Sequence, residues 1–386
     1  MRYTIGQLAE IIDGDRGKNY PKQDEFYPQG YCLFLNTGNV TKEGLIFEEN
    51  QFITKEKDEA LRKGKLKRGD IVYTTRGTVG NAGYYNSNVP YENVRINSGM
   101  VILRANGEIV NARFLYQILK SEYYRPYFKQ YCTGSAQPQL PIKNFSQIYL
   151  NVPDIKTQHR IADILSAYDD LIENNQKQIK LLEEAAQRLY KEWFVDLRFP
   201  GHENTKIVDG VPEGWIKEEI GKIIKKVHRT KQIVASEYKD EGSIPIVDQS
   251  RAFVAGYTND LEARVDFGIP IIVFGDHTRI VKLIQFPFAK GADGTQLIIS
   301  DCLEMPQRLL YCSIMNVDLS NYHYARHFKY LKEEKIMIPT VKVANEFENN
   351  VTGIFSKIQN CRDEIIRCQK TRDLLLPKLM SGEVEV

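Results

Sequence analysis

The sequence lacks the motifs that mark the commonest nucleotide-dependent and methyl-transferring enzymes. No two prolines are adjacent, so the [N/D/S]-P-P-[Y/F] loop of amino-methyltransferases is missing. Neither G-x-G-x-x-G nor G-x-x-x-x-G-K-[S/T] occurs, so the glycine-rich loops that cradle phosphates are missing too. These absences predict a chain that is not an enzyme and has no catalytic, cofactor-binding or metal-binding residues of its own.

Cysteine pairs and long apolar runs are also missing. The six cysteines form no C-x-x-C pair, which argues against a zinc ribbon or a thioredoxin-type redox site. No apolar run approaches the length of a membrane span, and no apolar signal region follows Met1. We therefore expect a cytoplasmic protein that does not contact membranes.

A strong net charge is missing as well. The chain has 52 basic and 50 acidic residues, so the sum of charges favours neither nucleic acid nor any other partner. Its 386 residues predict two or three domains, and a hydrophobic content of 42% is sufficient for sizeable cores.

What the sequence does contain is a repeat. The stretch IYLNVPDIKTQHRIADIL begins at Ile148 with alternating apolar residues, which is typical of a strand, and a helical pattern follows Pro153. The stretch IMIPTVKVANEFENNV does the same from Ile336, and Pro339 stands 186 residues after Pro153. Each half of the chain therefore ends in a strand that leads directly into a helix.

A heptad pattern follows each of these prolines. Apolar residues recur at alternating steps of four and three, with Asn175 and Arg372 as the polar exceptions. A strict 3.5-residue period favours two helices packed on each other, although each could instead pack on its own domain as an amphipathic helix. We expect Pro377 to end the second helix before Leu379. The predicted seam consists of Ile161, Leu165, Tyr168, Ile172, Ile179, Leu182, Leu189, Phe347, Val351, Ile354, Ile358, Cys361, Ile365, Cys368 and Leu375.

The remainder of each half is rich in predicted strands. GDIVYTTRGTVG in the first half is similar to GIPIIVFGDHTRIV in the second, and Arg279 falls in the region that matches Arg76. YTIGQLAEII is echoed by WIKEEIGKII. We predict an α/β (α+β) fold, a pseudo-two-fold dumbbell in which two globular domains are separated by an antiparallel coiled coil of two long helices, each roughly 50 Å long. The predicted boundaries are 1–153 for the first domain, 154–197 for the first helix, 198–339 for the linker and second domain, and 340–386 for the second helix and tail.

Polar and basic residues gather in the loops next to these strands. Arg, Lys and Gln can pair with base edges, and Ser, Thr and Lys suit phosphates, whereas the alternative is that these are ordinary solvated loops. GSAQPQ and YHYARHFK coincide when the halves are offset by 186 residues. The candidate DNA-contacting residues are Lys67, Thr74, Thr75, Arg76, Thr78, Ser135, Gln137, Gln139, His277, Thr278, Arg279, Lys282, His323, Tyr324 and Arg326.

Three segments of the chain are similar in sequence to a known protein family. The chain resembles the specificity (S) subunits of type I restriction–modification systems, most strongly in IKNFSQIYLNVPDIKTQHRIADILSAYDDLIENNQKQIKLLEEAAQRLYKEWFVDLRFPGHE, in TRDLLLPKLMSGEVEV and in GSAQPQL. The resemblance implies two target-recognition domains, each reading one half of a bipartite, asymmetric site in double-stranded DNA. It also implies helices that space the halves and dock two modification (M) subunits, which bind S-adenosylmethionine and methylate adenine. Restriction (R) subunits join that core. YHYARHFK departs from the GSAQP pattern, so loop roles do not transfer simply between the halves.

Two rival hypotheses remain. One is a coiled-coil spacer or interaction protein that bears two domains for carbohydrate or protein ligands, which salt-dependent retention on DNA would distinguish from a DNA reader. The other is a fused nuclease–methyltransferase, and the missing methyltransferase loop argues against it.

Overall fold

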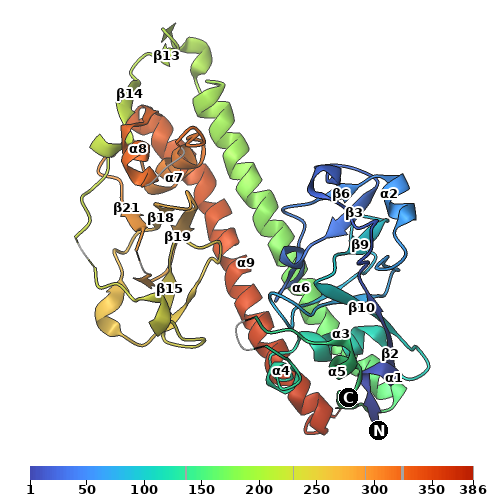
Figure 1. The fold of residues 1–386 in the computed structure, drawn as a ribbon. Coiled ribbons are helices and arrows are strands. Elements are labelled where there is room, and N and C mark those ends of the chain that lie inside the picture. The colour runs from blue at the N-terminus through green and yellow to red at the C-terminus, as the bar shows by residue number, and fades with distance from the viewer. Residues whose placement is uncertain (135–136, 229, 292, 323–325, 386) are drawn as a thin grey trace. The chain divides into compact units, whose positions relative to one another are not determined.

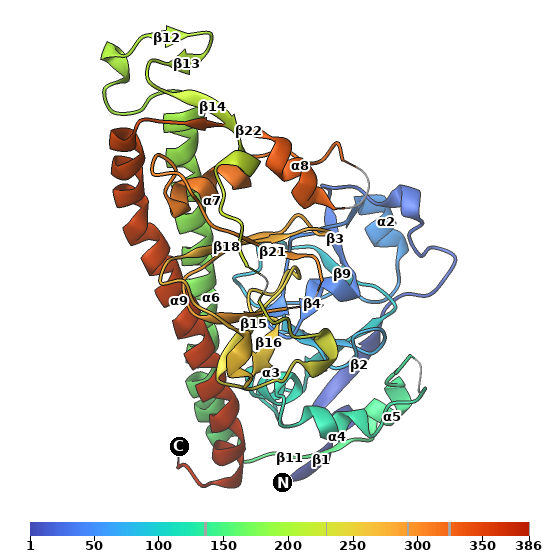
Figure 2. The ribbon, with the colours of Figure 1, turned by 90° about the vertical axis from the view of Figure 1, so that its left-hand side faces the viewer.

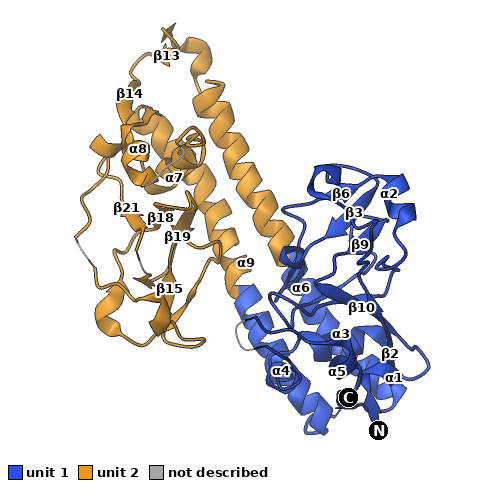
Figure 3. Ribbon diagram, viewed as in Figure 1, with its two compact units in different colours: residues 1–174, 364–386 blue, residues 175–363 orange. Residues whose placement is uncertain are grey.

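The computed structural model describes residues 1–134, 137–228, 230–291, 293–322 and 326–385. The chain divides into two compact units (Figure 3): unit 1 contains Met1–Asn174 and Glu364–Val386, and unit 2 contains Asn175–Asp363. Two long helices, α6 (Ile155–Tyr190) and α9 (Val341–Ser381), each contribute one part to each unit (Figure 1). Among the described residues, no helix is long and apolar enough to cross a membrane.

Each long helix follows a short strand, as the sequence repeat predicts. β11 (Tyr149–Asn151) precedes α6, and β22 (Lys335–Ile338) precedes α9. Asp154 caps the start of α6, because its carboxylate accepts the amides of Lys156 at 3.0 Å and of Thr157 at 3.2 Å. These bonds satisfy amides that the first helical turn cannot pair internally, so the helix begins at Ile155, directly after its cap.

The long helices run antiparallel. Within unit 2, Glu183 of α6 pairs with Arg362 of α9 at 2.9 Å, while the ring of Trp193, after α6, lies 5.7 Å from that of Phe347. Residue numbers therefore rise along the first helix as they fall along the second, and the two helices of unit 2 lie side by side in both views (Figures 1 and 2). The predicted mixed fold with a pair of long antiparallel helices is confirmed.

The prediction that Pro377 ends the second helix is wrong. Helix α9 continues through Pro377 to Ser381. Proline inside a helix removes one backbone hydrogen bond, but Leu376 and Leu379 on either side of it are 3% and 4% exposed in the core of unit 1. Burial of these two side chains offsets the lost bond, which local sequence rules do not take into account.

Two sheets in the described part of unit 1 have more than two strands. In the first, the strand order is β2 (Ala9–Asp13), β10 (Met100–Ala105), β7 (Ile71–Thr74) and β8 (Ala82–Tyr84), all antiparallel. In the second, β3 (Cys32–Leu35) pairs in parallel with β9 (Val94–Ile96) and antiparallel with β6 (Phe52–Ile53). The first strand, β1 (Arg2–Thr4), pairs with β11.

Unit 2 repeats these pairings with different residues. β18 (Ile271–Gly275) lies between β19 (Val281–Ile284) and β21 (Thr295–Ile298), as β7 lies between β8 and β10. β15 (Ile244–Val247) pairs in parallel with β20 (Phe288–Lys290) and antiparallel with β16 (Gly256–Thr258), as β3 does with its two partners. β14 (Ile216–Glu219) pairs with β22 (Figure 2), as β1 pairs with β11 in unit 1.

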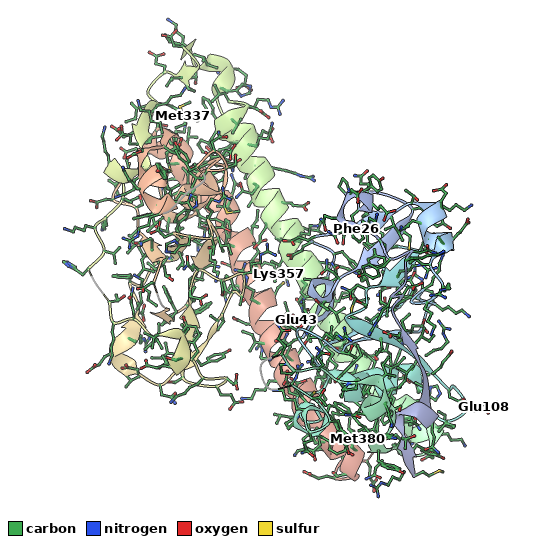
Figure 4. All side chains as sticks on the ribbon, viewed as in Figure 1. Phe26, Glu43, Glu108, Met337, Lys357 and Met380 are labelled. Atoms are coloured by element: carbon green, nitrogen blue, oxygen red, sulfur yellow. The ribbon has the colours of Figure 1, made fainter. Side chains whose placement is uncertain are left out.

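Helices complete the core of each unit (Figure 4). α3 (Ala112–Lys120) packs in the core of unit 1 together with Leu165 of α6, and α7 (Gln307–Met315) packs in the core of unit 2 together with Phe347 of α9. The shorter elements are α1 (Ile5–Leu8), α2 (Lys55–Ala60), α4 (Arg125–Lys129), α5 (Ile142–Ser146), α8 (His327–Glu333), β4 (Val40–Thr41), β5 (Gly44–Leu45), β12 (Ile207–Val208), β13 (Val211–Pro212) and β17 (Arg264–Val265).

Candidate nucleic-acid interface

Two threonines stabilise the turn that follows β7 in unit 1. Thr74 is fully buried, and its hydroxyl accepts a hydrogen bond from the amide of Asn81 at 2.9 Å. Thr75 is 4% exposed, and its hydroxyl donates to the carbonyl of Gly99 at 3.2 Å. The Thr74 hydroxyl bonds inside the turn and the Thr75 hydroxyl bonds to the residue before β10, so the prediction that Thr74 and Thr75 contact DNA is corrected.

The exposed part of this turn lies beside a polar segment from much later in the chain. Arg76 forms a β-bridge with Gln139, and the amide of Leu140 donates to the carbonyl of Thr75 at 2.9 Å. The backbone therefore joins the TTRGTVG turn to the GSAQPQL segment. The exposed candidate residues on these two segments are Arg76, Thr78, Gln137 and Gln139.

Two candidates of the first domain do not join this surface. Lys67 is exposed but precedes β7, whereas Arg76 follows it, so the length of the strand separates the two side chains. Ser135 lies outside the described residues.

A groove of about 1050 Å³ adjoins the turn and contains basic residues that the sequence did not single out. Lys42, Arg125 and Lys129 line it, together with the acidic Glu43, which is labelled in Figure 4. No sequence pattern marks these residues, because they come from different loops and helices and only the fold brings them together.

The turn after β18 in unit 2 has the same backbone connections as the first turn. Thr75 and Asp276 each donate an amide hydrogen bond to a glycine carbonyl, at 2.9 and 2.7 Å. Each also accepts, at 2.9 Å, an amide hydrogen bond from the segment that precedes the last strand. Thr75 and Asp276 are therefore equivalent, and His277 occupies the position of Arg76.

Arg279 corresponds to Gly80 rather than to Arg76. The amide of Gly80 donates to the carbonyl of Thr74 at 3.1 Å, and the amide of Arg279 donates to that of Gly275 at 2.8 Å. Both residues have positive φ, +103° and +61° respectively. Because the second turn is shorter by two residues, the match of Arg279 with Arg76 that the sequence favoured is corrected.

Two basic residues of unit 2 that were candidates for DNA contact instead make contacts inside the unit. The guanidinium of Arg279 donates to the carbonyl of Leu319 at 3.0 Å. Lys282 is 5% exposed, its ammonium donates to the carbonyls of Asp248, at 2.9 Å, and of Ala252, and burial lowers its pKa to about 8. The prediction that Lys282 contacts DNA is therefore corrected, because its side chain holds the loop after β15 from inside.

The remaining candidates of unit 2 lie on or beside the turn. His277 and Thr278 are exposed, and Gln249 fixes the turn: its side-chain oxygen accepts the amide of His277 at 3.1 Å, and its carbonyl accepts the hydroxyl of Thr278 at 2.7 Å. Arg326 is exposed directly before α8. His323 and Tyr324 lie outside the described residues.

Asp276 joins this turn to α8. Its carbonyl accepts the amide of His327 at 2.9 Å, and its carboxylate accepts the amide of Phe328 at 2.8 Å. The YHYARHFK segment thus reaches the second turn at the place where GSAQPQL reaches the first, although the residues on it differ completely.

The structure places the predicted seam residues in the interior of the units. Every one of the fifteen is buried or half-buried, and so are the polar exceptions Asn175 and Arg372. Arg372 pairs with Asp169 at 2.7 Å in unit 1, and Arg362 pairs with Glu183 at 2.9 Å in unit 2. The two ends of the helix pair therefore use different charged residues.

Comparison with known proteins agrees with this organisation. Residues 1–184 match the family described as the type I restriction modification DNA specificity domain. The chain is 28% identical over 364 residues to the type I restriction enzyme MjaIX specificity subunit of Methanocaldococcus jannaschii, covering 85% of this chain and 81% of that one. It is 32% identical over 195 residues to the HindI specificity subunit of Haemophilus influenzae, covering 50% and 42% of the two chains. The crystal structure of the S subunit from M. genitalium matches with a TM-score of 0.56 at 16% identity, covering 98% and 95% of the two chains, and so supports the fold.

These matches agree with the duplicated domains and the paired helices of the chain. The chain is similar to the specificity subunits of type I systems, as its sequence segments predicted.

Proposed function

We propose that each globular domain reads one half of a bipartite, asymmetric DNA site. The reading turn is the one that follows β7 in the first domain and β18 in the second. The observation that carries this proposal is the duplicated backbone junction at Thr75 and Asp276, which joins an exposed turn to a polar segment in both units. The side chains presented there differ, with Arg76 in one domain and His277 in the other. Domains with one framework and different exposed side chains are expected to select different bases.

The second part of the proposal concerns partners. The paired helices dock two M subunits, one for each half of the sequence repeat, and R subunits join the assembly. S-adenosylmethionine binds to the M subunits, and the specificity chain itself carries no cofactor. We expect the complex to work in the cytoplasm. Native mass spectrometry of the purified complex tests the stoichiometry, and a mass with a single M subunit for each specificity chain would contradict it.

Methylation of a DNA library tests the reading function. The chain and its M subunits would be incubated with S-adenosylmethionine and duplexes randomised over about 20 base pairs, and the methylated molecules would be sequenced. We expect two short, unlike sequence elements at a fixed separation. Methylation of a single uninterrupted element, or of all sequences equally, would contradict the split-site proposal.

The alternative function, a spacer with two non-DNA ligand-binding domains, predicts no salt-dependent retention on DNA. Electrostatic contacts to phosphates make DNA binding fall steeply as salt rises. Retention of the assembled complex on immobilised duplex at several salt concentrations therefore separates the two functions.

A further inference from the structure

Unit 2 contains a basic groove that no sequence motif marks. The groove has a volume of about 760 Å³ and lies between the segments 224–228 and 230–232, the strands β20 and β21, and α8. No acidic residue is among the described residues that line it. Its basic residues are Lys225, Lys226, His228, Lys290 and Lys332.

The fold fixes this groove at several points. The amide of Lys225 donates to the carbonyl of Ile299, directly after β21, at 2.8 Å, and Gln232 forms a β-bridge with Lys290. Gly221 lies so close to α8 that a Cβ there would stand 3.0 Å from the carbonyl oxygen of Lys332. The basic side chains therefore project from backbone that is anchored to strands and to a helix.

The surroundings leave much of this positive charge uncompensated. Lys225 stands 3.8 Å from Asp301, but both side chains are more than half exposed, and such pairs contribute little. The ammonium of Lys332 lies 5.3 Å from the ring centroid of Phe328. Burial lowers the pKa of Lys290, while the charge of Asp293 opposes that shift. An anion in the groove would gain from several ammonium groups at once.

The first domain has a different charge at the equivalent place. Ile5 and Ile220 each donate an amide hydrogen bond, at 2.9 Å, to the residue directly before β11 or β22, so these two residues are equivalent. Glu10 therefore stands where the second domain has Lys225. Glu10 lies 3.8 Å from Arg104. The concentration of lysines is therefore a property of the second domain and is not imposed by the shared framework.

We propose that this groove binds the phosphodiester backbone of duplex DNA beside the half-site that the second domain reads. The inference rests on the proposed function and adds to it a contact that fixes position without reading sequence. Lysine suits this role, because its ammonium is a point charge that can meet a phosphate oxygen from several directions.

Neutralising two exposed lysines of the groove tests the proposal. The variant Lys225→Gln/Lys226→Gln would be compared with Lys206→Gln/Lys217→Gln, which removes two exposed lysines of the same unit from outside the groove. Both would be assembled with the M subunits. Binding would be measured from 50 to 300 mM NaCl, once to a duplex that contains the recognition site found in the library experiment and once to an unrelated duplex.

Each phosphate contact contributes about 0.9 to the slope of log affinity against log salt. We expect the groove variant to reduce that slope by about two units on both duplexes, with unchanged sequence preference, and the control to match the wild type. If wild type prefers its site but the groove and control variants have equal slopes, the groove proposal is wrong and the proposed function stands. If wild type shows no preference between the duplexes, the proposed function itself fails.

Free phosphate is the other ligand that offers these lysines the same anionic oxygens as the DNA backbone. Thermal unfolding of the complex in 10 mM inorganic phosphate, compared with chloride at equal ionic strength, distinguishes the two. The proposal would be overturned if phosphate stabilised the wild-type complex, Lys225→Gln/Lys226→Gln abolished that stabilisation, and the variant left the salt slope of DNA binding unchanged. The ligand of the groove would then be a free anion and not DNA.

Discussion

Asp169 of α6 accepts a hydrogen bond from Arg372 of α9 at 2.7 Å inside unit 1. Lys120 of α3 places a second cation 3.2 Å from the same carboxylate. Burial raises the pKa of Asp169, but the attraction of Lys120 and Arg372 outweighs burial and holds the pKa below its ordinary value. These three charges connect both long helices to the first globular domain.

Asp169→Asn should destabilise unit 1 by about 3 kcal/mol, because it leaves two mostly buried cations without a counter-charge. Asp170→Asn is the matched control, since Asp170 is the exposed neighbour on the same helix, and we expect a change within about 0.5 kcal/mol. Urea unfolding measures both. Equal stability of the two variants would show that the ion pairs contribute nothing to the packing of α6 against α9.

The effect of Asp169→Asn should depend on pH in one direction. The folded-state pKa of Asp169 is lower than the unfolded one, so its contribution is complete above about pH 4 and is lost as pH falls through the folded-state pKa. We expect the stability difference between wild type and Asp169→Asn to be the same at pH 7 and pH 5 and to shrink at pH 3. A difference that already shrinks between pH 7 and pH 5 would contradict this assignment.

Arg279 offers a test of backbone strain. Its φ of +61° is favourable for glycine and costs about 1 kcal/mol for a residue with a Cβ, while its guanidinium holds Leu319. Both Arg279→Ala and Arg279→Gly lose the bond to Leu319, but only alanine keeps the strain. We therefore expect Arg279→Gly to be about 1 kcal/mol more stable than Arg279→Ala in thermal unfolding. The opposite order would show that the turn changes conformation in the variants.

The sequence predicted the parts of this fold that follow from periodicity. The heptads beginning at Ile161 and Phe347 correctly predicted two long helices, because a 3.5-residue period leaves few other ways to bury an apolar stripe. The repeated strand, proline and helix around Pro153 and Pro339 gave the duplication. Both signals are local and are spread over many residues, so no single exception removes them.

Individual loop residues could not be predicted in this way. Thr74 and Lys282 are polar side chains next to predicted turns, but they are buried because their partners are backbone carbonyls and amides brought together by the fold. Arg279 was matched with Arg76 because the sequence shows the residue type, whereas the turn length that makes Arg279 equivalent to Gly80 appears only in the backbone hydrogen bonds.

Pro377 provides a prediction for the end of α9. A proline in a helix interior removes a hydrogen bond to the carbonyl four residues earlier, here that of Asp373, and costs up to about 3 kcal/mol relative to alanine. Because α9 continues to Ser381, Pro377→Ala should stabilise unit 1 by about 1–3 kcal/mol in urea unfolding. Lower stability would show that the proline ring makes packing contacts worth more than the missing bond.

The reading turns provide the last prediction. Arg76→Ala should relax base choice in the half-site of the first domain by about 1–3 kcal/mol for the affected position, because a guanidinium that pairs twice with one base edge is lost. His277→Ala should relax choice in the other half-site only. Lys67→Ala is the control, because Lys67 is exposed but lies at the opposite end of β7. Methylation of a library randomised in both half-sites measures all three. If Arg76→Ala weakened methylation of every sequence equally, with unchanged preference in both halves, Arg76 would be a phosphate contact and base reading would have to come from other residues of the first domain.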